Sequence, residues 1–126
     1  MSSGPARRRR LTHDAGLRAE QIAELWLRMK LYRILARRYR VDGGEIDIIA
    51  QRGDAIVFVE VKARATMDDA RTAITPQKLR RFSIAAARWL AANPWAARYT
   101  LRGDAVFIAP RRLPHHAVCA FELRLG

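Results

Sequence analysis

Cysteine and histidine are scarce in this chain: it has one cysteine and three histidines in 126 residues. A lone thiol, Cys119, cannot form an internal disulfide, which fits a reducing cytoplasm. Its apolar neighbours, AVCAF, predict a small core residue rather than a nucleophile. His115 and His116 are adjacent and would point to opposite faces of a strand, so we expect both in a loop. No cysteine or histidine cluster has zinc-site spacing.

Long apolar runs are also missing, and no stretch approaches the length that spans a bilayer. The basic N-terminus lacks the hydrophobic segment of a secretory signal, so we interpret it as a tail. The sequence contains no glycine-rich phosphate loop, no nucleophile elbow and no internal repeat. These absences predict a cytoplasmic protein without a membrane partner, and they leave its chemistry to other residues.

Acidic residues number 12 against 24 lysines and arginines, which gives a net charge of +12. Residues 7–10 are four arginines, which leaves +8 on the remainder of the chain. A field of this sign attracts polyanions, of which nucleic acid is the commonest and an anionic membrane surface the second. The alternative is an arginine-rich proteome in which arginine simply replaces lysine as the solvated charge.

The length fits one domain with a single core. Half of the residues are hydrophobic and 29% are charged, as in soluble globular proteins. Residues 1–13 are small, polar and basic without periodicity, and we expect a disordered tail. That tail either adds nonspecific phosphate affinity or has no role. Residues 14–126 form the predicted domain.

A first helix is expected from Asp14 or Gly16 to about Lys30, because Asp14 can cap it and apolar residues recur at helical spacing. Glu20 lies at the border of the wider apolar side, in line with Ala23 and Leu27. The residues expected to cover a sheet are Ile22, Leu25, Trp26 and Met29.

Residues 31–41 predict a strand in which arginines alternate with aromatic and apolar side chains. Such a strand suits a phosphate backbone, and it equally suits an edge strand guarded by charge. Residues 65–73 are a polar connection, either a mobile loop over a substrate groove or a simple link. Two further strands are expected at about residues 98–109 and 117–125.

A second helix is expected over residues 75–92, with Thr75 as its cap and Pro76 at its first position. Its basic side could lie on nucleic acid, although a solvated helix face has the same composition. The predicted buried stripe is Leu79, Phe82, Ala86 and Trp89. The predicted contacts to nucleic acid are Lys78, Arg80 and Arg81 on this helix, with Arg64 before it.

The chain is organised around residues 43–64, GGEIDIIAQRGDAIVFVEVKAR, which predict two strands joined by a turn at Gly53 and Asp54. In the second strand, alternation places Glu60 and Lys62 on one face. If the strands pair across the turn, Asp47 of the first strand lies near both.

Two carboxylates and an ammonium group in this arrangement could hydrolyse a phosphodiester. Asp47 and Glu60 offer hard oxygen ligands for Mg²⁺ or Mn²⁺, which would activate a water and polarise the phosphoryl oxygen. Lys62 could orient that water or meet developing negative charge. A Glu-x-Lys pattern on a strand is also common as a simple ion pair. The preceding aspartate and the basic helix are the features that strengthen the interpretation as a catalytic site.

The order GGEIDIIA, DAIVFVEVKAR and a TP-initiated basic helix, preceded by YRILARRYR and followed by RGDAVFI, resembles the YraN family of small bacterial proteins. The resemblance covers about residues 16–109. That family is assigned to the restriction-endonuclease-like fold, whose signature is an aspartate followed by Glu/Asp-x-Lys (PD-(D/E)XK). The resemblance implies Asp47, Glu60 and Lys62 as catalytic residues, with Glu20 as an additional acidic ligand beside Asp47 and Glu60. It also implies kinship with Holliday-junction resolvases.

The sequence departs from the family pattern at four positions. Leu31 stands where the family usually has glycine before an aromatic residue, and Arg38 stands where it usually has asparagine. Gly103 replaces a phenylalanine before aspartate, and Leu79 replaces a glutamine. The role of that glutamine is not transferred to Gln77.

We therefore predict an α/β fold with a mixed sheet of about five strands flanked by helices, of the restriction-endonuclease-like type. The preferred function is an endonuclease dependent on Mg²⁺ or Mn²⁺ that acts on DNA rather than RNA, with branched or damaged DNA as a candidate substrate. A homodimer is compatible with cutting two strands. The alternatives are a nucleic-acid-binding module of the same fold without catalysis, and a protein-assembly component.

Overall fold

The computed structural model describes residues 5–125 of the chain. Its elements follow in this order: α1 (Pro5–Met29), β1 (Arg33–Val41), β2 (Gly44–Arg52), β3 (Ala55–Ala63), α2 (Met67–Arg71), α3 (Pro76–Ala92), the 3-10 helix η1 (Pro94–Arg98), β4 (Thr100–Ile108) and β5 (His115–Phe121).

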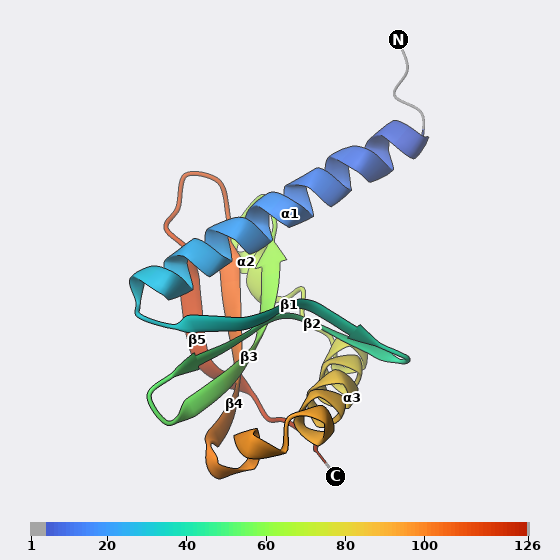
Figure 1. The fold of residues 1–126 in the computed structure, drawn as a ribbon. Coiled ribbons are helices and arrows are strands. Elements are labelled where there is room, and N and C mark those ends of the chain that lie inside the picture. Colours follow the sequence, from blue (N-terminus) through green and yellow to red (C-terminus); the bar gives the residue numbers. More distant parts are fainter. Residues whose placement is uncertain (1–4, 126) are drawn as a thin grey trace.

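The strands form one sheet in the order β1-β2-β3-β4-β5 (Figure 1). β1, β2 and β3 are mutually antiparallel neighbours, β3 and β4 are parallel, and β5 returns antiparallel to β4. The parallel pair requires a crossover, and residues 64–99 with α2 and α3 supply it. The structure confirms the predicted mixed sheet of five strands and the two strands of residues 43–64.

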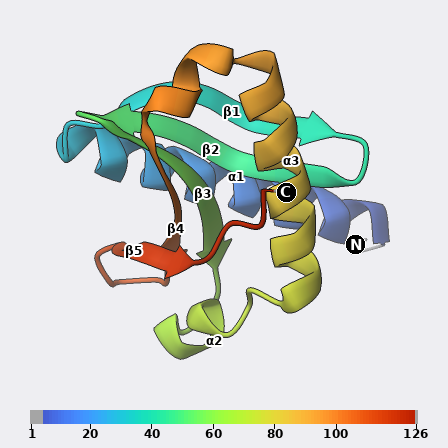
Figure 2. The same cartoon turned by 90° about the horizontal axis from the view of Figure 1, so that it is seen from below.

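Helices cover both faces of the sheet (Figures 1 and 2). On one face, Ala23 and Leu27 of α1 pack against Val57 and Val59 of β3. On the other face, the side chains of α3 pack against β2 and β3, with Phe82 and Trp89 among the buried residues. Leu79 is only partly buried, whereas the rest of the stripe predicted for α3 is buried.

The α3 helix lies directly against β2 at Gly44. A Cβ atom at Gly44 would collide with the carbonyl oxygen of Arg81, and it would lie 2.9 Å from the amide nitrogen of Ala85. Only glycine permits this approach of two backbones. Gly44 therefore fixes α3 beside the strand that carries Asp47.

Helix α1 begins earlier than the sequence predicts. It starts at Pro5, so residues 5–13 are helical rather than a disordered tail, and the expected start at Asp14 or Gly16 is wrong. Proline is well suited to a first helical turn, and the alanine, leucine and arginines that follow favour a helix. Figure 1 shows the first turns of α1 extending beyond the sheet. The rest of the predicted tail, residues 1–4, lies outside the described residues.

The face that α1 buries also differs from the prediction. Ala19, Ala23 and Leu27 are buried, whereas Ile22, Leu25 and Met29 are 44%, 60% and 67% exposed. Both sets recur at helical spacing, so periodicity alone could not choose between them. Two alanines allow the helix to lie close to β3, a selection that depends on packing rather than on hydrophobicity.

Three local predictions are also corrected. The connection at residues 65–73 contains α2, capped by the hydroxyl of Thr66. His115 and His116 belong to β5 rather than to a loop. Cys119 is exposed and has a positive φ of 54°, so it is not a core residue.

The C-terminus of α1 ends at a residue with left-handed backbone geometry. The amide of Leu31 donates to the carbonyl oxygen of Arg28, and the amide of Tyr32 donates to that of Leu27, which together form a Schellman motif. Leu31 occupies the C′ position with φ of 70°, where glycine is favoured. Leu31 is therefore a position of backbone strain.

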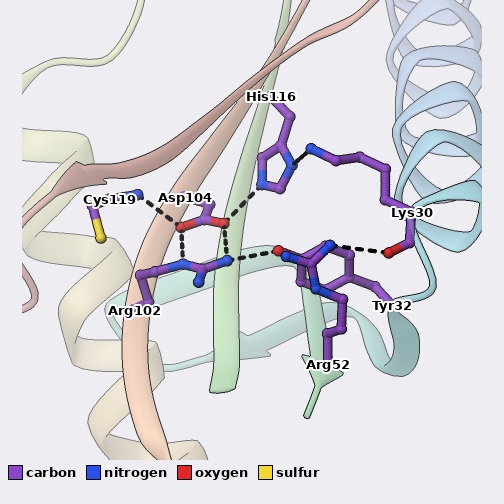
Figure 3. Close-up of polar contacts among 7 residues, drawn as sticks. All are labelled: Lys30, Tyr32, Arg52, Arg102, Asp104, His116 and Cys119. Carbon is purple, nitrogen blue, oxygen red and sulfur yellow. Dashed lines mark hydrogen bonds and ion pairs between the residues drawn. The ribbon is translucent and has the colours of Figure 1, made fainter. Parts of the chain in front are cut away.

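A buried polar cluster ties this end of α1 to the sheet (Figure 3). The carboxylate of Asp104, fully buried on β4, accepts from Arg102 Nε at 2.9 Å and from the Cys119 amide at 3.1 Å. It also accepts from His116 Nε2 at 2.7 Å, because His116 Nδ1 lies 2.7 Å from the ammonium of Lys30 and must itself accept. Arg102 also donates to the hydroxyl of Tyr32. The cluster thus joins β4 and β5 to Lys30 and Tyr32, in the connection between α1 and β1.

Replacing Leu31 with glycine is expected to stabilise the fold by roughly 0.5–1 kcal/mol, because it relieves the left-handed strain. Leu31 is 81% exposed, so little apolar burial is lost. Urea unfolding measures the change. Leu113→Gly is the control, because Leu113 is 75% exposed but does not have a positive φ. Equal effects of the two substitutions would contradict this account of Leu31.

Replacing Asp104 with asparagine is expected to destabilise the fold by about 3 kcal/mol or more, because it leaves the guanidinium of Arg102 buried without its charged partner. Urea unfolding at neutral pH checks this value. Asp54→Asn, at an exposed turn residue, should change the stability little. Equal stability of the two variants would show that the cluster does not hold the fold.

The same substitution should flatten the acid side of the stability profile. Burial raises the pKa of Asp104, but hydrogen bonds from His116 and Arg102 outweigh it and keep the pKa below the usual 3.8. The stabilisation that ionised Asp104 gives to the fold is therefore complete above about pH 4. It is lost as the pH falls through the lower pKa of Asp104 in the folded state. Thermal unfolding between pH 6 and pH 2 should show a steeper loss in the wild type than in Asp104→Asn. Parallel curves would refute the assignment.

Candidate active site

The sheet divides where β2 and β3 stop pairing. Their register runs from Arg52 opposite Ala55 to Ile48 opposite Val59 and goes no further. Beyond that point β2 continues along β1 and β3 continues along β4. Figure 1 shows the two pairs of strands diverging. The division leaves the ends of β2 and β3 separated, with α1 across them.

Asp47 stands at this division. Its Oδ2 atom accepts a hydrogen bond of 2.7 Å from the amide of Val61. The carboxyl group thus satisfies a backbone donor of β3 that the interrupted ladder leaves free. This hydrogen bond fixes the side chain of Asp47 beside residues 60–62 of the neighbouring strand.

A cavity of about 320 Å³ opens between α1 and the diverging strands. It is lined by Glu20 of α1, by Asp47 of β2, and by Glu60 and Lys62 of β3. The structure therefore brings together the four residues that the sequence singled out as catalytic. Their roles in catalysis stay predictions.

Glu60 and Lys62 form a mostly buried ion pair in this cavity. Lys62 Nζ lies 3.0 Å from Glu60 Oε1, and the two side chains are 14% and 11% exposed. Burial disfavours the charged form of Lys62, but the Glu60 carboxylate outweighs this effect and raises the pKa of Lys62. Lys62 is thus a fixed positive charge at the cavity wall.

Asp47 is buried close to two other carboxylates, Glu60 and Glu20. Burial and the negative charge of Glu60 raise the pKa of Asp47 to about 8, with a smaller contribution from Glu20, against the opposing hydrogen bond from Val61. The raised pKa means that the empty site favours the protonated form of Asp47 near neutral pH. A cation that entered the cavity would favour the ionised form of Asp47 and offset the charge of Glu60.

Glu20 is held by an arginine with strained backbone geometry. Arg38 Nε donates to Glu20 Oε1 at 2.8 Å, and Arg38 has φ of 48° within β1. This position requires a left-handed conformation, which asparagine tolerates better than arginine. The ion pair links α1 to β1 beside Asp47.

The oxygen donors of the cavity fit a magnesium-type ion better than a softer metal. Asp47 and Glu60 are hard ligands, and Mg²⁺ often binds one or two carboxylates and keeps several waters. Among residues 15–125, whose side chains the structure describes, no three acidic, histidine or cysteine side chains form a ready-made metal cluster. Coordination by Glu20 would require it to leave Arg38.

The predicted nucleic-acid contacts divide into two groups. Arg64 lines the cavity, and Lys78 lies beside Lys62. The polar contact with the Lys62 side chain and burial lower the pKa of Lys78. Arg80 instead lines a different cavity of about 430 Å³, between α3 and the C-terminal segment. Arg81 is exposed on α3. Only Arg64 and Lys78 are placed to meet a strand entering the carboxylate cavity.

Two residues near the site had no role assigned from the sequence. Glu45 lines the cavity with a half-exposed side chain, 3.5 Å from Arg40. Its place two residues before Asp47 on the same strand was the available signal. Arg38 was noted only as a departure from the family pattern, and its left-handed φ explains why that position matters.

Comparisons with known proteins identify the family of this chain. The profile of the "Uncharacterised protein family UPF0102" matches residues 19–108. A UPF0102 protein of Methylocella silvestris is 63% identical over 111 residues, which cover 88% of this chain and 90% of the relative. A UPF0102 protein of Methylobacterium nodulans is 57% identical over 118 residues, covering 94% and 92%. No helix in the described part of the chain is long and apolar enough to cross a membrane. The chain belongs to the uncharacterised family UPF0102.

Proposed function

We propose that this protein is a metal-dependent nuclease that hydrolyses phosphodiester bonds in DNA. The observation that carries the proposal is the shared cavity of Asp47, Glu60 and Lys62, where the sheet divides. The resemblance to the restriction-endonuclease-like superfamily supports it, since an aspartate followed by Glu-x-Lys is the signature of that fold.

Asp47 and Glu60 would hold Mg²⁺ or Mn²⁺, with Glu20 as an additional acidic residue beside them. The bound ion would supply an activated water and neutralise charge on the phosphate. The hydrogen bond from the Val61 amide orients Asp47 before any substrate arrives. This preorganisation reduces the rearrangement that the reaction requires.

Lys62 is the residue of this chain best placed to act on the reacting groups. Its ammonium group is held against Glu60 at 3.0 Å within the same cavity. From there it can orient the attacking water or stabilise negative charge that develops on the phosphate. Because it cannot accept a proton while it is charged, we assign it a positioning and electrostatic role rather than that of a general base.

The basic character of the chain suits a polyanionic substrate. Arg64 and Lys78 add positive charge at the cavity and beside it, and each can neutralise a phosphate. DNA in the cytoplasm is the proposed partner. A second copy of the chain would bring a second cavity to a duplex, so a homodimer belongs to this proposal.

A nucleic-acid-binding module without catalysis is the competing function, and one observation favours it. In the part of the chain with described side chains, residues 15–125, no three metal-ligating side chains converge, and Glu60 already has Lys62 as its partner. A chain that had lost catalysis could keep the basic surface and the fold. Cleavage and binding therefore need separate measurements.

Replacing Asp47 with asparagine is expected to reduce cleavage of DNA at least about 100-fold, because the metal loses a charged ligand. The asparagine keeps an oxygen that can accept from the Val61 amide, so folding should be preserved. Glu60→Gln should behave in the same way. The assay is a panel of duplex, single-stranded and junction DNA with Mg²⁺ or Mn²⁺.

Asp54→Asn is the matched control for cleavage, because Asp54 lies in the turn at the opposite end of β2 and β3. It should cleave as the wild type does. If the wild-type protein binds DNA with a steep salt dependence but cleaves no member of the panel, the binding module is the correct function.

Replacing Lys78 or Arg64 with alanine should weaken DNA binding and lower the salt dependence of the binding constant. Each lost phosphate contact reduces the slope of log K against log salt by about 0.9. Fluorescence anisotropy from 50 to 200 mM salt measures the slope. Arg88→Ala is a control farther along α3. If Arg88→Ala lowered the slope as much as Lys78→Ala, DNA binding would depend on the total charge of the protein rather than on the position of Lys78.

A further inference from the structure

A second groove adjoins the carboxylate cavity. It has a volume of about 490 Å³ and runs between α1 and residues 109–114, which join β4 to β5. Ala15, Ala19, Ala63 and Arg64 line both spaces. A chain that crosses the carboxylate cavity can therefore continue into the groove.

The groove combines apolar walls with a cationic lining. Ile22, Ile108, Pro110 and Pro114 contribute apolar surface. Its charged lining residues are four arginines, Arg18, Arg64, Arg111 and Arg112, and no carboxylate is among the residues that line it. An occupant that fits both features presents an apolar face and carries negative charge.

We propose that this groove binds an unpaired nucleotide of the strand whose phosphate enters the carboxylate cavity. An unstacked base offers a flat apolar face, and its phosphates match the arginines, whose guanidinium planes can also stack on bases. In a duplex, the base faces are covered by their neighbours. The inference rests on the proposed nuclease function and narrows its substrate to DNA with a single-stranded segment next to the cleavage point.

Two other occupants fit less well. A second copy of this chain would bring further positive charge against four arginines, because the protein carries +12. An acidic protein segment would match the charge, but it would not account for the continuity with the carboxylate cavity. A nucleic-acid strand accounts for both features.

The test measures binding without divalent metal, so that it does not depend on cleavage. Fluorescence anisotropy compares a duplex with a single-stranded tail and the same duplex with an abasic tail of equal length. The two tails carry the same phosphates and differ only in their bases. The wild type should bind the tail with bases about fivefold more tightly, a modest value because the groove lacks aromatic side chains.

Ile22→Gln should abolish this preference by removing apolar surface from the groove wall. Arg111→Ala combined with Arg112→Ala should weaken both tailed duplexes, because it removes phosphate contacts. Leu25→Gln is the matched control: Leu25 is exposed on the same helix but does not line the groove, so the preference should remain. The proposal is overturned if the wild type binds both tails equally, or if Leu25→Gln loses the preference as Ile22→Gln does.

An acidic peptide tests whether the groove instead binds an acidic protein segment. The proposal is overturned in favour of a protein partner if two results coincide. Ile22→Gln loses the binding of polyglutamate that the wild type shows, and Ile22→Gln keeps the preference for the tail with bases. The nuclease function is judged separately. A wild type that cleaves DNA but shows no base preference refutes only the groove, and one that shows the preference but cleaves nothing refutes only the nuclease.

Discussion

The architecture of the site depends on one hydrogen bond, from the Val61 amide to the Asp47 carboxyl group. It replaces the next rung of the ladder between β2 and β3, whose pairing ends at Ile48 and Val59. Two strands that would otherwise continue side by side can therefore separate without leaving this buried donor unpaired. The cavity exists because the sheet opens at this point, and the residue that stabilises the opening is itself a proposed ligand.

The opening between β2 and β3 forms a cavity only if α1 stays in place across it. Its position is fixed near the middle by the ion pair between Glu20 and Arg38, and at its end by the cluster around Asp104. The second constraint is mostly buried and shares no residue with the cavity lining, so it can keep the helix in place while charges in the cavity change. Burial and the negative charge of Glu60, which raise the pKa of Asp47, make an ionised Asp47 unfavourable in the empty site. Stability elsewhere in the fold offsets this local cost.

The sequence predicted the central strands well because their physics is local. β-Branched residues flank a Gly53-Asp54 turn, and alternation along one strand places Glu60 and Lys62 together. It could not choose the buried face of α1, because Ile22, Leu25 and Met29 recur with the same period as Ala19, Ala23 and Leu27. The two faces of α1 differ in how closely they allow the helix to approach the sheet, and this packing distance selects the face with the alanines. His116 was missed for a similar reason: its partners, Lys30 and Asp104, are far away in the chain. The resemblance to a known family supplied Glu20, which no local pattern marked.

The central claim is that Asp47 and Glu60 hold one divalent cation where β2 and β3 separate. The most direct measurement is a titration with Mn²⁺ followed by nuclear magnetic resonance, in which the paramagnetic ion broadens the signals of nearby amides. The account predicts that the amides of Asp47 and Val61 broaden first, and that Glu60→Gln removes the effect at the same Mn²⁺ concentration. Uniform broadening over the surface, or broadening centred elsewhere and unchanged in Glu60→Gln, would contradict it.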